Sequence, residues 1–145
     1  MKLNIGNDNY IVEESTQVTL KVENEVNTYK VLEAEGALKE EGYVVLNNIY
    51  VNPEHTKEFE NRFLNRTTHL QETDGFQALR VLRPESSSSY VILTLWESIA
   101  AFKNWQDSQQ YKKTHSKRGT SQGIDKNIVD RSKSFNKGYE VVQAE

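Results

Sequence analysis

Residues 43–52 read Tyr43-Val-Val-Leu-Asn-Asn-Ile-Tyr-Val-Asn52, and both of their alternating sets are mainly apolar. This pattern predicts a strand that has no wet face. Two more strand-like runs follow, from Phe76 to Arg83 and from Tyr90 to Glu97. The segment between them contains Pro84 and then four consecutive serines, which is typical of a hairpin loop.

A helix is expected between the first two of these strands, from Glu54 to about Gln71. Pro53 closes the strand before it, and apolar residues then recur at helical spacing. Those residues are Phe59, Phe63 and Leu70.

A second helical region is expected after the hairpin, in two segments. The first segment carries Phe102 and Trp105. Asp107 and Ser108 are residues that cap helices, so they predict the start of a second segment, which carries His115.

The polar stretch from Thr120 to Asn136 predicts a long loop, and residues 139–143 predict a last strand. From Tyr43 onward the expected order is therefore strand, helix, strand, strand, helix, strand. This is an α+β fold with the ferredoxin-like split βαβ arrangement, in which one antiparallel sheet carries both helices on one side.

The other side of this sheet would be wet in a monomer. Val44, Leu46 and Tyr50 lie on that side, and they are poor residues for a wet face. A second subunit that covers them is the simplest remedy, so the pattern predicts a homodimer.

The first 42 residues are expected to form a strand-rich extension packed on a main domain of residues 43–145. Residues 10–12 and 18–22 alternate like edge strands, and residues 28–34 suit either a third strand or a short helix.

Composition excludes several classes of protein. The chain has 145 residues, 36% of them hydrophobic and 27% charged, with a net charge of −3. This suits one soluble domain and gives no basic face for nucleic acid. It has no cysteine, no apolar run that could span a membrane and no apolar signal-like segment after Met1. We therefore expect a cytoplasmic protein that binds neither nucleic acid nor membrane.

Several motifs carry a resemblance to a known family. They are Val45-Leu-Asn-Asn-Ile, Phe59-Glu-Asn-Arg-Phe, Gly75-Phe-Gln-Ala-Leu-Arg-Val-Leu-Arg-Pro, Tyr90-Val-Ile-Leu-Thr-Leu-Trp-Glu, Ala101-Phe-Lys-Asn-Trp and His115-Ser-Lys-Arg-Gly-Thr-Ser. Over residues 43–125 the chain resembles the heme-degrading monooxygenases of the IsdG/HmoB type. These belong to the antibiotic biosynthesis monooxygenase (ABM) superfamily, whose fold is a dimeric α/β-barrel. The resemblance is strongest to the heme monooxygenase B branch, whose members carry an extra N-terminal region.

The resemblance implies an oxidoreductase that uses heme as both cofactor and substrate. Dioxygen and electrons from an external donor, such as a reductase, open the porphyrin and release iron. The family pattern falls on Asn47, Trp105 and His115, with His115 as the axial ligand of the heme iron. An ungapped match to Phe63 selects Asn47 rather than its neighbour Asn48, and Phe63 is assigned to heme binding.

Each of these residues also has a plainer interpretation. Neutral imidazole is a good ligand for heme iron, but His115 near a helix end can equally be an exposed cation that interacts with the helix dipole. Trp105 is implied to press on the porphyrin plane, or it is a core residue. Asn47 is expected to be a buried amide that polarises dioxygen, or one that is bonded to nearby backbone.

Other side chains are weaker candidates. Phe59, Phe63 and Leu93 suit either the lining of an apolar cavity or the core. Lys117 and Arg118 suit contacts with heme propionates or simple solvation. Arg80 and Arg83 are expected to be structural or to lie at a dimer edge.

Two other functions remain open at this point. One is a cofactor-free ABM oxygenase that acts on an aromatic or quinone substrate. The other is a non-catalytic heme-binding or regulatory module, because a fold alone does not define a function.

Overall fold

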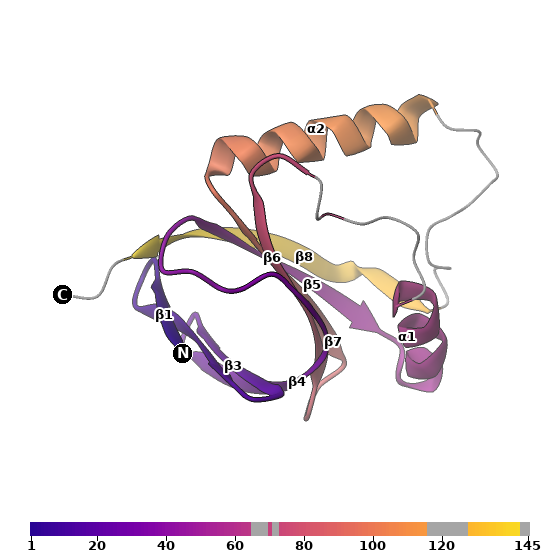
Figure 1. The fold of residues 1–145 in the computed structure, drawn as a ribbon. Coiled ribbons are helices and arrows are strands. Elements are labelled where there is room, and N and C mark those ends of the chain that lie inside the picture. The colour runs from indigo at the N-terminus through magenta and orange to yellow at the C-terminus, as the bar shows by residue number, and fades with distance from the viewer. Residues whose placement is uncertain (65–69, 71–72, 116–127, 143–145) are drawn as a thin grey trace.

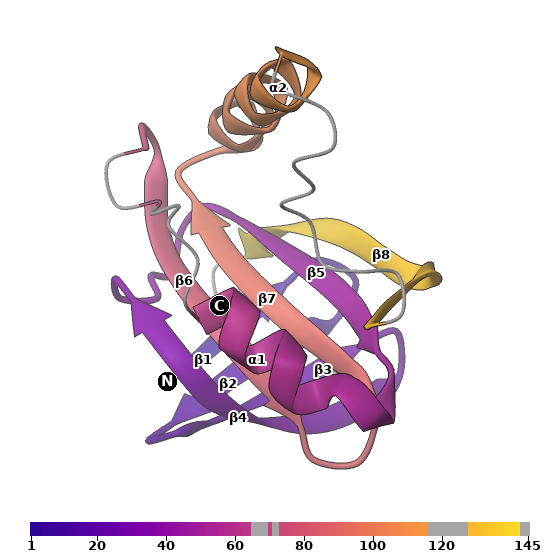
Figure 2. The same cartoon turned by 90° about the vertical axis from the view of Figure 1, so that its right-hand side faces the viewer.

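The computed structural model describes residues 1–64, 70, 73–115 and 128–142, with the backbone alone for 109–115. Eight strands close into a barrel in the order β1-β2-β3-β4-β6-β7-β5-β8 (Figure 1). Every neighbouring pair with a described register is antiparallel. The two helices lie outside the barrel (Figure 2).

The first half of the barrel comes from the N-terminal residues. Its strands are β1 (Lys2–Ile5), β2 (Asn9–Glu14), β3 (Gln17–Val22) and β4 (Glu25–Glu35). The turn between β3 and β4 consists of Glu23 and Asn24, which both have positive φ angles, of 53° and 70°. Such a turn matches the twist of the two strands that it joins. Residues 28–34, for which a strand and a short helix were both open, form part of a strand.

The second half has the order of elements that the sequence predicts from Tyr43 onward. The elements are β5 (Tyr43–Val51), the 3₁₀ turn η1 (Pro53–His55), α1 (Thr56–Leu64), β6 (Phe76–Pro84), β7 (Ser89–Trp96), α2 (Ile99–His115) and β8 (Val129–Val142). A mixed α/β, ferredoxin-like fold is thus supported. The sheet is not open, however, since the N-terminal strands complete it into a barrel.

Three of the predicted bounds differ from the structure. The helix expected from Glu54 begins as a 3₁₀ turn and becomes an α-helix at Thr56, and part of its expected end lies outside the described residues. The two segments expected around Asp107 are one continuous helix, α2. The last strand begins at Val129 instead of Tyr139, because residues of the expected loop pair with β5.

The apolar face of β5 that carries Val44 and Leu46 packs inside the barrel, whereas the sequence pattern predicted that a second subunit would cover it. Val44 and Leu46 are 0% and 3% exposed. They pack in one core cluster with apolar residues of the first three strands: Leu3, Ile5, Ile11, Val18 and Leu20. Val44 and Leu46, which were attributed to a contact with a second subunit, are therefore covered by the same chain, and Tyr50 is half-buried. These two core residues no longer give a reason to predict a homodimer.

Arg80 joins the two halves of the barrel. It lies on β6 with only 5% of its surface exposed. Its Nε donates to a carboxylate oxygen of Glu13 on β2 at 2.6 Å, and its Nη1 donates to the backbone carbonyls of Glu35, Gly36 and Leu79 at 2.8–3.0 Å. Arg80 thus has the structural role that the sequence predicts. Its contacts connect segments that are far apart in the sequence.

Gly36 allows this close approach. Its φ is +69°, and a Cβ atom there would lie 2.0 Å from the backbone oxygen of Gln77. Any other residue would push β4 away from β6 at the point where the carbonyl of Gly36 meets Arg80.

Among the described residues, no helix has the length and apolar character required to cross a membrane.

Candidate functional site

A cavity of about 280 Å³ lies on the outer face of the second half of the barrel, between the sheet and the first half of α2. Its lining comes from all four strands of that half and from both helices. The lining residues are Val45, Asn47, Phe63, Leu70, Leu79, Ile92, Thr94, Phe102, Trp105, Gln106 and Asn136. Three of the residues assigned by resemblance, Asn47, Phe63 and Trp105, are thus brought together.

Asn47 points into this cavity because side chains alternate along β5. Val45 and Asn47 face outward, whereas Val44 and Leu46 face the barrel interior. The expectation of a buried amide is wrong, because Asn47 is exposed. Among the described residues, the Asn47 side chain makes no hydrogen bond. The plainer interpretation, an amide bonded to nearby backbone, is therefore not supported for those residues.

Asn136 is a site residue that the sequence did not predict. It lies directly opposite Asn47 on β8, and Ile92 lies opposite Asn47 on β7. Side chains of directly paired residues are close enough to contact one ligand. The cavity therefore offers two neighbouring carboxamides on a mainly apolar wall.

Trp105 belongs both to an aromatic cluster and to the cavity lining. Its ring centre lies 5.4 Å from that of Trp96 and 6.2 Å from that of Phe102, so it is part of an aromatic cluster. Trp96 is fully buried, and its indole Nε1 donates to Thr94 Oγ1 at 2.9 Å. This hydrogen bond fixes the orientation of the Trp96 ring against which Trp105 packs. Trp105 itself is half-buried and lines the cavity. A rigid aromatic surface is thus presented to whatever binds there.

The other predicted aromatic and aliphatic residues divide between cavity and core. Phe63 lines the cavity. Phe59 is buried against Tyr90, with ring centres 4.8 Å apart, and Leu93 faces the barrel interior. Phe59 and Leu93 are therefore core residues.

His115 is the last residue of α2, and its side chain lies outside the described residues, as do Lys117 and Arg118. The backbone of α2 is continuous from Trp105 to His115. At the α-helical rise, ten residues correspond to about 15 Å along the axis.

A second histidine, His55, lies on η1, with its Nδ1 2.8 Å from Glu58 Oε1.

An ion-pair cluster holds α1, and with it Phe63, against the sheet. Arg83 on β6 donates through Nε and Nη2 to the Glu60 carboxylate at 2.9 and 2.6 Å, and the Tyr90 hydroxyl donates to the same group. These contacts, led by the hydrogen bond from Arg83, lower the pKa of Glu60. Burial and the adjacent carboxylate raise the pKa of the Tyr90 hydroxyl. Arg83 is thus structural, as expected.

Replacing Glu60 with glutamine is expected to lower the free energy of unfolding by about 1–3 kcal/mol at pH 7. The pKa of Glu60 is lower in the folded state, so the carboxylate stabilises the fold above its ordinary pKa and this contribution is lost as the pH falls through the lowered value. Urea unfolding from pH 7 downward should show the two proteins converging in acid. Glu41→Gln, at an exposed loop position, is the matched control. A constant difference at all pH values would contradict the assignment.

Comparisons with known proteins bear on the family and the fold of the chain. A family model described as "Antibiotic biosynthesis monooxygenase" matches residues 42–117. A heme-degrading monooxygenase of Listeria monocytogenes is 28% identical over 80 residues, which is 55% of this chain and 48% of that protein. The chain thus spans about half the length of this curated relative.

Solved structures share the fold. One described as a major regulator of staphylococcal pathogenesis superposes with a TM-score of 0.68 at 15% identity, covering 99% of this chain and 84% of that one. LmHde, a heme-degrading enzyme from Listeria monocytogenes, gives 0.57 at 20% identity, covering 95% and 83%. The heme-degrader MhuD from Mycobacterium tuberculosis, with two hemes bound in its active site, gives 0.54 at 25% identity, covering 71% and 98%.

Proposed function

Because the chain belongs to the antibiotic biosynthesis monooxygenase family, we propose that it degrades heme oxidatively, binding heme as its substrate in the cavity between α2 and the sheet. The observation that carries this proposal is the convergence of Asn47, Phe63 and Trp105 on one cavity. These residues come from a strand and two helices and are far apart in the sequence. The heme-degrading relatives of similar sequence or fold support the choice of substrate.

The chemistry of the lining fits a heme. Leu70, Leu79 and Ile92 give an apolar wall for the macrocycle, and Phe102 extends it on the side of α2. Asn47 and Asn136 are the polar groups set into this wall. An apolar pocket with a few polar groups that fix orientation is the usual form of a small-molecule site.

His115 is proposed as the axial ligand, through a neutral imidazole nitrogen. Its backbone position is about 15 Å along α2 from Trp105, on the same continuous helix. Heme, when bound, supplies the activation of dioxygen, and an external electron donor such as a reductase supplies the electrons.

We propose that the protein acts in the cytoplasm.

The remaining work belongs to the side chains of this chain. The Asn47 amide would donate a hydrogen bond into the cavity, toward the oxygen that reacts with bound heme. Trp105, braced by Trp96 and Phe102, presses on the ring plane. The apolar wall excludes water. None of these roles requires a second subunit, because all the residues named here belong to one chain.

Titration with hemin, followed by ascorbate under air, tests the proposal. We expect a Soret band to develop with one saturating equivalent or a small multiple of it, and to decay only when both reductant and oxygen are present. A protein that gives no Soret shift would overturn the proposal. A Soret band that persists in ascorbate and air would leave a heme-binding protein without turnover.

Asn47→Ala is expected to slow the decay of the Soret band by about tenfold or more, with hemin affinity changed only a few-fold. The reason is that one hydrogen bond directed at the reacting oxygen acts on the reaction more than on binding. Asn48→Ala is the matched control, since Asn48 points to the opposite side of β5. If Asn48→Ala slowed turnover and Asn47→Ala did not, the assignment of the two asparagines would be reversed.

A further inference from the structure

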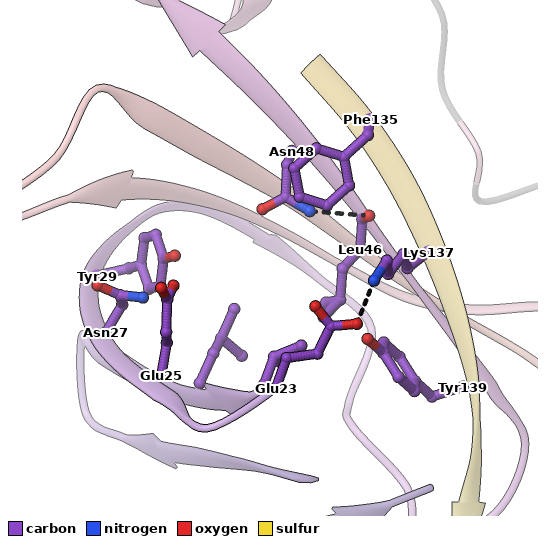
Figure 3. Close-up of a pocket in the computed structure, with 11 residues that line it drawn as sticks. Glu23, Glu25, Asn27, Tyr29, Leu46, Asn48, Phe135, Lys137 and Tyr139 are labelled. Atoms are coloured by element: carbon purple, nitrogen blue, oxygen red, sulfur yellow. Dashed lines mark hydrogen bonds and ion pairs between the residues drawn. The ribbon is translucent and has the colours of Figure 1, made fainter. Parts of the chain in front are cut away.

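A second cavity, of about 190 Å³, lies at one mouth of the barrel, on the opposite side of β5 from the candidate heme site (Figure 3). It is enclosed by the β3–β4 hairpin on one side and by β5 and β8 on the other. The lining residues are Leu20, Val22, Glu23, Glu25, Asn27, Tyr29, Leu46, Asn48, Phe135, Lys137 and Tyr139. Asn48 lines this cavity and Asn47 lines the other, so the two sites share the strands β5 and β8 but no residue.

Tyr139 brings an unsatisfied hydroxyl to this cavity. The residue is 9% exposed, and its buried hydroxyl has no hydrogen-bond partner in the part of the chain that the structure describes. Figure 3 shows the hydroxyl directed toward Glu23 and the interior of the mouth. A buried hydroxyl without a partner is costly, and such groups in folded proteins generally have one. A ligand in the cavity would supply the missing partner.

The charges at the mouth favour a cation. Glu23 and Lys137 form an ion pair across it, from the β3–β4 turn to β8. Glu25 adds a second carboxylate on the β4 side, and no ion pair or hydrogen bond of Glu25 is found among the described residues. Two carboxylates and one ammonium leave a net charge of −1, which disfavours an anion.

Aromatic rings stand around the same cavity. Tyr29, Phe135 and Tyr139 lie on different sides of it in Figure 3, and Phe135 is 53% exposed at the rim. Aromatic faces attract organic cations, and cages of such rings are used to bind quaternary ammonium groups. The combination of three rings with a free carboxylate is therefore suited to an ammonium compound.

We propose that the barrel mouth binds a small organic cation that carries both an ammonium group and a hydroxyl. Glu25 and the aromatic faces hold the ammonium group, and the Tyr139 hydroxyl bonds the hydroxyl of the ligand. The size of the cavity is appropriate, since a cavity of about 150 Å³ in another protein accommodates benzene. This proposal does not rest on heme degradation, because none of the residues that line the barrel mouth lines the candidate heme cavity.

Choline is the probe, and 3,3-dimethylbutan-1-ol, which has the same shape without the charge, is its control. In amide NMR titrations of the full chain, we expect choline to give saturable shifts at residues of the mouth. The neutral alcohol should bind about tenfold more weakly, which corresponds to about 1.4 kcal/mol. No saturable shift with choline, or equal affinity for the two compounds, would overturn the proposal.

Variants test the individual groups. Glu25→Gln should weaken choline about tenfold, whereas Glu140→Gln, an exposed neighbour of Tyr139 on β8, should leave its affinity unchanged. Tyr139→Phe keeps the ring and removes the hydroxyl, so it should weaken choline several-fold without loss of folding. Wild-type affinity in Glu25→Gln would overturn the carboxylate's role, and wild-type affinity in Tyr139→Phe would overturn that of the hydroxyl.

Discussion

Arg80→Met is expected to lower the free energy of unfolding by about 3–5 kcal/mol. The guanidinium is almost fully buried and bonds the Glu13 carboxylate and three backbone carbonyls. Methionine fills much of the volume but makes none of these bonds. The Glu13 side chain, which is 23% exposed, would then keep its charge without a partner. A loss of this size is a large part of the stability of a typical domain.

Urea unfolding at pH 7 measures this effect. Arg131→Met, which removes the same charge at an exposed position of β8, should change stability by no more than about 0.5 kcal/mol. Adding Glu13→Leu to Arg80→Met should restore part of the loss, because the double variant no longer buries an unpaired charge. A stability of Arg80→Met equal to that of the control would mean that Arg80 does not hold the two halves together.

Arg80 is important because it joins the N-terminal strands to the rest of the barrel, and the sequence pattern did not predict that these strands close the barrel. The apolar faces of β5 and β7 are visible in the sequence, and so is the need to cover Val44 and Leu46. Which segment covers them is a property of tertiary structure. Residues 1–35 are rich in polar residues because the outer faces of their strands are wet, and this concealed that their inner faces complete a barrel.

Two local errors have similarly physical causes. Residues 129–136 are mainly polar, yet they form a strand because the pairing with β5 uses backbone groups, which do not depend on side-chain polarity. Ser108 suggested a helix cap, but in α2 its hydroxyl donates back to the carbonyl of Trp105 at 2.9 Å. A serine in mid-helix can make this bond without ending the helix.

The candidate site was predicted in part. Asn47, Phe63 and Trp105 came from the resemblance, and the alternation along β5 separates Asn47 from Asn48 because the two point to different cavities. Asn136 and Gln106 carry no signal of their own in the sequence. Asn136 enters the site only through its register with Asn47, which depends on how far β8 extends.

His115→Ala is expected to weaken hemin binding by at least about 100-fold and to shift or abolish the Soret band. Loss of a residue that merely orients a metal ligand already costs 10–100-fold in affinity, and loss of the ligand itself should cost no less. His115 is the last residue of α2, and α2 lies outside the barrel (Figure 2), so we expect the barrel to fold in this variant. Circular dichroism and urea unfolding should therefore match the wild type.

Two comparisons make this result specific to iron ligation. His55→Ala, at a half-exposed histidine on η1, should bind hemin as the wild type does. Free imidazole added to His115→Ala should restore a Soret band close to that of the wild type, because it replaces the lost ligand without replacing any other function of the side chain. If His115→Ala keeps the wild-type affinity and Soret position, the iron is held by another group. The cavity beside Trp105 would then have to bind its ligand through the apolar wall and the two asparagines alone.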